Sequence, residues 1–156
     1  MTTPTKDSVQ HESRSDTVTH LLEECRMVLP GIQALFGFQL IAVFNAAFWE
    51  KLHWHEQCLH LAAIGLVAIS VALVMTPAAY HRQAEPETIS KRFISLSTKL
   101  LAWSMVPLLF AIALEVYIIG RLILESWIGS LLLSSILVTI FMSLWFILPR
   151  FRLFRN

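Results

Sequence analysis

Four long apolar segments alternate with polar ones along this chain, and the alternation predicts most of its architecture. The apolar segments cover about residues 27–49, 58–80, 98–120 and 127–148. A helix of about 22 residues rises roughly 33 Å, which is enough to cross the hydrocarbon core of a bilayer. We therefore expect an all-α integral membrane protein with four transmembrane helices in an antiparallel bundle.

The segment before the first span predicts a tail and an interfacial helix. Residues 1–16 contain almost no apolar side chains and cannot repay the entropy of ordering, so we expect a disordered tail. Asp16 or Thr17 can cap a helix along the membrane surface, and Pro30 can kink that helix into the first span. The transmembrane domain would then cover residues 17–149.

The later polar segments predict the remaining connections. Residues 81–97 return to charged side chains and have room for a short amphipathic helix at 89–96, ahead of the third span. Pro77 would lie in the last turn of the second span, and Pro149 would end the fourth. Residues 150–156 would form a basic tail.

Small residues recur at short intervals in the second span. They are Ala62, Gly65, Ala68, Ser70 and Ala72. Such spacing lets two helix backbones approach closely in a membrane. We therefore expect this face of the second span to pack against a neighbouring helix.

Composition supports a membrane protein over a water-soluble domain. Hydrophobic residues make up 56% of the 156 residues and charged residues 15%, with a mean hydropathy of +0.63. Soluble domains carry about 25% charged residues, and one of this size has too little interior to hide so much apolar surface. A bilayer is the expected solvent for most of the chain.

The distribution of positive charge predicts the orientation. Of the 12 Lys and Arg residues, all but Lys51 and Arg121 fall on the side of both termini. Those on the terminal side are Lys6, Arg14, Arg26, Arg82, Lys91, Arg92, Lys99, Arg150, Arg152 and Arg155. Because cytoplasmic loops carry the excess of Lys and Arg, we expect both termini in the cytoplasm.

Two blocks carry a resemblance to a known family. Residues 22–38 read Leu-Glu-Glu-x-Arg-x-x-Leu-Pro-Gly-x-Gln-x-Leu-Phe-Gly-Phe, and residues 76–82 read Thr-Pro-Ala-Ala-Tyr-His-Arg. The chain resembles a bacterial membrane family known only as domain of unknown function six-three-two-eight. The resemblance implies a small protein of the bacterial inner membrane. Some members carry the label sodium:proton antiporter, and no motif in this sequence supports that label.

The same two blocks contain charges that could meet at the cytoplasmic interface. The start of the first span and the end of the second are antiparallel neighbours, so Glu23 or Glu24 can reach His81 or Arg82. The simplest interpretation is a structural clamp, because such charge pairs are common and stabilise a protein only modestly when they are exposed to water. The alternative is proton handling by His81 beside a carboxylate.

Glu115 is the acidic residue well inside a span, in the outer half of the third. An ionised carboxylate there costs about 2.5 to 3.5 kcal/mol, so it should face the bundle, pair, or stay protonated. Arg121 falls about 120° away on the same helix, which places the partner on another helix. Polar residues at comparable depth on the other spans are Asn45, His60, Ser130 and Ser134. The cluster could handle a proton or cation, or only join helices.

The outer loop is rich in potential metal ligands. His53, His55, Glu56, Cys58 and His60 lie within eight residues. His and Cys side chains can bind zinc or copper, but this spacing matches no established site. Metal binding on the outer face is therefore a minor hypothesis.

No motif indicates an enzyme, and none indicates a cofactor. The chain has no phosphate-cradling glycine loop, no nucleophile with a base, and no metalloprotease pair.

The leading hypothesis is a small oligomeric component of ion or proton transport, or a channel. The alternative is a structural or accessory membrane protein. Expected partners are the lipid bilayer and further copies of the chain or another membrane protein, and not nucleic acid.

Overall fold

The computed structural model describes residues 6–84 and 90–153, and side-chain environments for residues 16–84 and 90–150. All elements in these ranges are helical, and four of them are long: α1 (Lys6–Ala42), α3 (Trp54–Ala84), α4 (Lys91–Leu124) and α5 (Trp127–Met142). A short helix, α2 (Ala46–Lys51), lies between α1 and α3. The π-helical segment η1 (Ser143–Ile147) and helix α6 (Leu148–Leu153) continue α5.

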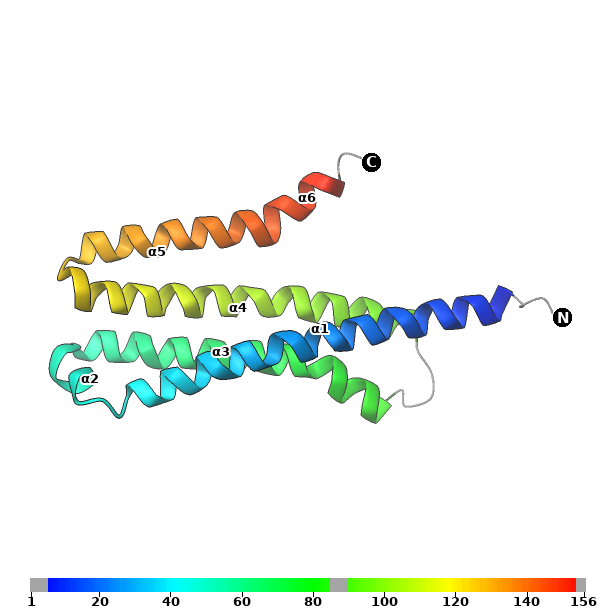
Figure 1. Ribbon diagram of the computed structural model, residues 1–156, viewed down its shortest axis with the longest axis horizontal. Coiled ribbons are helices and arrows are strands. Elements are labelled where there is room, and N and C mark those ends of the chain that lie inside the picture. Colours follow the sequence, from blue (N-terminus) through cyan, green and yellow to red (C-terminus); the bar gives the residue numbers. More distant parts are fainter. Residues whose placement is uncertain (1–5, 85–89, 154–156) are drawn as a thin grey trace.

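The long helices run side by side in an antiparallel bundle (Figure 1). Helix α4 lies between α5 and α3, and α1 crosses over α3 and also contacts α4. Both described ends of the chain lie at one end of the bundle, which we call the termini end. Helix α2 and the α4–α5 connection lie at the opposite, loop end. All four helical segments are long and apolar enough to span a membrane, which confirms the predicted fold class.

Helix α3 supplies one side of the core through a regular seam. Its buried residues are Glu56, His60, Ala63, Val67, Ser70, Val74 and Pro77. The steps between them alternate between four and three, which is the spacing that keeps one stripe of a helix against its neighbours. The seam contacts α4 and α1.

The small residues predicted to pack lie mostly on the other side of this helix. Ala62, Gly65, Ala68 and Ala72 are exposed, and only Ser70 is buried. A Cβ atom added at Gly65 would meet nothing within 4 Å. The prediction was therefore wrong for packing within the chain, because the buried seam of α3 runs through Ala63, Val67 and Ser70 instead.

Helix α1 differs from the predicted tail and interfacial helix. It is one continuous helix from Lys6 through Pro30 to Ala42, so residues 6–16 are helical and residues 1–5 lie outside the described part. Adding turns to an existing helix is cheap compared with nucleating one. The first span also ends earlier than the predicted residue 49, because the Asn45 side chain accepts a hydrogen bond from Ala47 N and starts α2.

The third span likewise begins earlier than predicted. Ser90 caps α4 by accepting a hydrogen bond from Phe93 N at 3.0 Å, and the helix then runs without a break to Leu124. The separate amphipathic helix predicted at 89–96 is thus the start of α4 from residue 91, and residues 85–89 lie outside the described part. Helix α3 continues past Pro77 to Ala84.

The fourth helix does not stop at Pro149. The chain passes through the π-helical turn η1, where Leu148 N–H bonds to Ser143 O, and α6 then includes Pro149. A proline clashes with the carbonyl group four residues earlier and lacks an N–H to bond it. That carbonyl belongs to Trp145 inside η1, so the wider turn removes the conflict.

Candidate functional site

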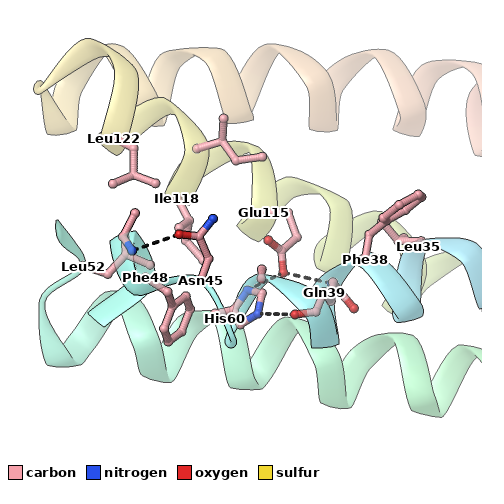
Figure 2. A pocket seen from close by; sticks show the side chains of 13 residues that line it. Leu35, Phe38, Gln39, Asn45, Phe48, Leu52, His60, Glu115, Ile118 and Leu122 are labelled. Carbon is pink, nitrogen blue, oxygen red and sulfur yellow. Dashed lines mark hydrogen bonds and ion pairs between the residues drawn. The ribbon is translucent and has the colours of Figure 1, made fainter. Parts of the chain in front are cut away.

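A polar cluster joins three helices in the half of the bundle near the loop end (Figure 2). Glu115 of α4 and His60 of α3 meet through Glu115 Oε1 and His60 Nδ1, 3.0 Å apart. Gln39 of α1 donates from Nε2 to the same Oε1 at 2.9 Å. The other imidazole nitrogen, His60 Nε2, lies 3.0 Å from the backbone oxygen of Gln39. Each of the three helices therefore contributes one side chain to a closed set of contacts.

The cluster is shielded from bulk water but not sealed. Gln39 and His60 are each 3% exposed, and the Glu115 side chain is 16% exposed. All three line a cleft of about 340 Å³ whose other walls are mainly apolar. Phe48 of α2 also lines the cleft and packs edge-on against the His60 ring, with centroids 5.1 Å apart. The lining of the cleft extends from Glu115 to Leu52 and Leu122, which lie nearer the loop end.

The geometry limits where the protons of the His60–Glu115 pair can lie. A backbone carbonyl can only accept, so His60 Nε2 carries a hydrogen and donates it to Gln39 O. The His60 Nδ1 contact then holds one further proton, either on the imidazole beside a carboxylate or on the carboxyl group beside a neutral imidazole. Both arrangements leave the pair without net charge. Removing the shared proton would place two lone pairs 3.0 Å apart, which is unfavourable.

Gln39 offers one unused acceptor at this site. Its Oε1 is buried and has no hydrogen-bond partner among the described residues. Buried polar atoms are nearly always bonded, so an orphaned one needs an explanation. If Glu115 and His60 both carried a proton, the carboxyl hydrogen could bond Gln39 Oε1 after a rotation of the amide group. The site therefore has acceptors for one or for two protons.

The structure brings together only part of the predicted outer cluster. His60 contacts Glu115, and Asn45 lines the same cleft while capping α2. Ser130 instead donates to Ser126 O in its own helix region, and Ser134 donates across to Ala113 O. These two serines lie between α4 and α5, on the face of α4 opposite the one that carries Glu115.

Sequence reasoning missed Gln39 as a site residue. A single amide in an apolar span does not indicate which helix it faces, and the polar residues of α1 do not line up on one face of the helix. One signal was available: a buried amide in a membrane needs a partner, and Glu115 was the carboxyl group without one.

A second buried carboxyl group lies closer to the loop end. Glu56 is 2% exposed and accepts a hydrogen bond from Arg121 Nε at 2.8 Å, and its other oxygen accepts from His53 N at 2.9 Å. It thereby caps the start of α3 and ties it to the end of α4. Lys51, His53, Glu56, Arg121 and Glu125 line a neighbouring cleft of about 380 Å³.

The potential metal ligands of the outer loop are not gathered into one site. Glu56 is bonded to Arg121, His60 faces Glu115, and Cys58 is exposed. His53 and His55 stack on each other with ring centroids 5.6 Å apart. In the part of the chain that the structure describes, no three His, Cys, Asp or Glu side chains are grouped as metal ligands.

The predicted cytoplasmic clamp is not formed among the described residues. Glu23 lies 3.7 Å from His20 on its own helix, and neither Glu23 nor Glu24 pairs with His81 or Arg82. His81 packs against Phe93 of α4, and its Nδ1 is buried without a hydrogen-bond partner. The acidic side chains are exposed on α1 and point away from the groove between α1 and α3 that His81 and Arg82 line.

Comparison with known proteins gives a family but no activity. The family model described as Family of unknown function (DUF6328) matches residues 8–149. No curated protein matches the chain, and no solved structure does. The matched range includes Gln39, His60 and Glu115, and the description assigns no role to any of them.

Proposed function

Because the chain belongs to this family of unknown function, we propose its activity from the site itself: proton binding and release at the Glu115–His60 pair, within a small membrane component of proton or cation transport. The observation that carries the proposal is the 3.0 Å contact between Glu115 Oε1 and His60 Nδ1 beside an open cleft. Intramembrane ionisable groups are costly, and those that persist commonly mark ion or proton pathways.

The local environment suits a proton that the pair can exchange better than it suits a permanent ion pair. Imidazole exchanges protons near neutral pH, and a carboxyl group in apolar surroundings can hold one as well. The pair is neutral while it shares one proton, so it can rest in a membrane at low cost. In the proposal, water reaches Glu115 through the cleft that this residue lines, and the unpartnered Gln39 Oε1 can stabilise an added proton.

Transport across the membrane requires more than this one conformation. Val67 and Ala111 are fully buried between the cluster and the termini end. In the proposal, the second half of the route opens through a change in helix packing or through assembly with another copy of the chain. The termini end faces the cytoplasm of a bacterial cell in this proposal, which the excess of basic residues at that end supports.

A structural role is the competing function, and specific contacts favour it. Ser70 donates to Ser104 O and Ser134 donates to Ala113 O, so these two buried hydroxyl groups bond one helix to another. The Glu115 contacts with His60 and Gln39 could do the same. The protein would then be an accessory membrane protein without flux.

Reconstituted vesicles separate the two functions. We expect the purified chain to carry a proton or sodium flux under an imposed potential, measured with a pH-sensitive or a sodium-sensitive dye inside the vesicles, and Glu115→Gln to lower it at least about tenfold. Glu125→Gln, which removes an exposed carboxyl group at the α4–α5 connection, is the matched control and should retain the flux. Equal flux in wild type and Glu115→Gln would reject the role of Glu115, and wild-type flux no greater than that of empty vesicles would reject transport.

A further inference from the structure

A cleft at the termini end carries a concentration of positive charge that the proposed function does not use. It lies between α1 and α3, has a volume of about 320 Å³, and is lined by Arg26, His81 and Arg82. We call it the basic cleft. It is at the opposite end of the bundle from Glu115, so its role is independent of the proton site.

The two arginines of the basic cleft have no acidic partner in the part of the chain that the structure describes. The ion pairs there involve His20, His53, His60 and Arg121, and neither Arg26 nor Arg82 takes part in one. Glu24, the expected partner, lines a different cleft between α1 and α4. Two exposed arginines from different helices therefore line one hollow, and neither is in an ion pair with a described carboxylate.

The walls of the basic cleft indicate which anion it suits. A guanidinium group presents a planar fork of N–H donors that matches the oxygens of a phosphate. The remaining walls include Leu22, Leu29, Val74 and Met75, which are apolar and continue into the membrane-spanning part of α1 and α3. A charged rim above an apolar wall fits a phosphate group that is attached to hydrocarbon.

We propose that the basic cleft binds a phosphate group, with Arg26 and Arg82 holding its oxygens and the apolar wall contacting any attached acyl chain. The depth of the cleft supports this assignment. Arg82 ends the apolar part of α3, where Tyr80 stacks on Phe93 with ring centroids 5.8 Å apart. Aromatic side chains of this kind concentrate at the level of lipid headgroups. A phospholipid headgroup and a free phosphate share the chemistry, and the test separates them.

The test uses the full chain, purified in detergent and examined by native mass spectrometry. The probes are phosphatidylglycerol, diacylglycerol with the same acyl chains, and inorganic phosphate. We expect the wild type to bind phosphatidylglycerol at least about tenfold more tightly than diacylglycerol, because only the first has a phosphate for the arginines. If inorganic phosphate binds and phosphatidylglycerol does not, the proposal stands with a soluble anion as the ligand.

Substitutions decide whether the basic cleft is the site. Arg26→Gln with Arg82→Gln should weaken phosphatidylglycerol binding about tenfold. The matched control, Arg92→Gln with Lys99→Gln, removes the same charge from exposed positions at the same end of the bundle and should stay within about twofold. Equal weakening in both double variants would overturn the proposal, because the effect would then be general surface charge.

A charge-preserving variant tests whether misfolding explains a loss of binding. Arg26→Lys with Arg82→Lys keeps both charges but loses the planar fork, so we expect binding weakened at least about threefold with an unchanged melting temperature. Wild-type affinity in this variant together with wild-type affinity in the glutamine variant would overturn the proposal. So would a wild type that binds diacylglycerol as tightly as phosphatidylglycerol and does not bind inorganic phosphate.

Discussion

Two buried carboxyl groups in this bundle have partners of different chemistry. Glu56 is bonded to Arg121, which is charged at any ordinary pH, whereas Glu115 is bonded to His60, which is not. A guanidinium partner holds a carboxylate in one protonation state. An imidazole partner can exchange the proton that it shares. At the level of single residues, this difference is why we propose proton chemistry at Glu115 and a structural role for Glu56.

Removing Arg121 alone should therefore lower the stability of the protein more than removing Arg121 and Glu56 together. Arg121→Met leaves Glu56 buried without its cation, and we expect the free energy of unfolding to fall. Adding Glu56→Leu should recover most of that loss, because no unpaired charge remains. Denaturation in detergent, followed by circular dichroism, measures both variants. Arg92→Met, at an exposed position, is the control, and a double variant as unstable as the single one would contradict the expectation.

Among the described elements, α5 packs mainly on α4, and its buried residues are Ser130 and Ser134. The two helices approach closely at Gly120 of α4, where an added Cβ would lie 3.1 Å from the Ser130 Cβ and 3.2 Å from its Cα. The missing side chain at Gly120 therefore sets the distance between the two helices at the loop end.

Gly120→Ala should push α5 away from α4, since backbone and side-chain atoms of Ser130 would both have to move. We expect a loss of about 1 to 3 kcal/mol, the usual range for overpacking. Gly65→Ala is the matched control, because a Cβ there meets nothing within 4 Å. Thermal unfolding in detergent checks the pair. Equal stability of the two variants would show that α5 is not packed on α4 in this register.

At the scale of the whole molecule, the outer surface is the strongest sign of a bilayer. Large apolar side chains such as Leu132 and Ile136 of α5 are 60% and 59% exposed. A water-soluble protein rarely exposes apolar surface on this scale, and lipid is the solvent that would cover it. An even number of spans also puts both ends of the chain on one side.

Single-cysteine labelling in cells tests that orientation. In a background with Cys25 and Cys58 replaced by alanine, Glu50→Cys lies at the loop end and Gln83→Cys at the termini end, both at exposed positions. We expect a membrane-impermeant maleimide to label the first in cells with a permeable outer membrane, and the second only after the inner membrane is opened. The reverse pattern would place the termini outside the cytoplasm.

The amino-acid sequence by itself determined the four spans, their antiparallel order and the helical class, because membrane crossing depends on length and hydropathy, which are local properties. It also singled out Glu115 and His60, since polar groups in apolar spans are conspicuous. Only the tertiary structure decided which polar groups meet. Gln39 belongs to the site, Ser130 and Ser134 lie outside it, and Glu56 pairs with Arg121. Helix rotation decides such pairings, and rotation follows from packing between segments far apart in the chain.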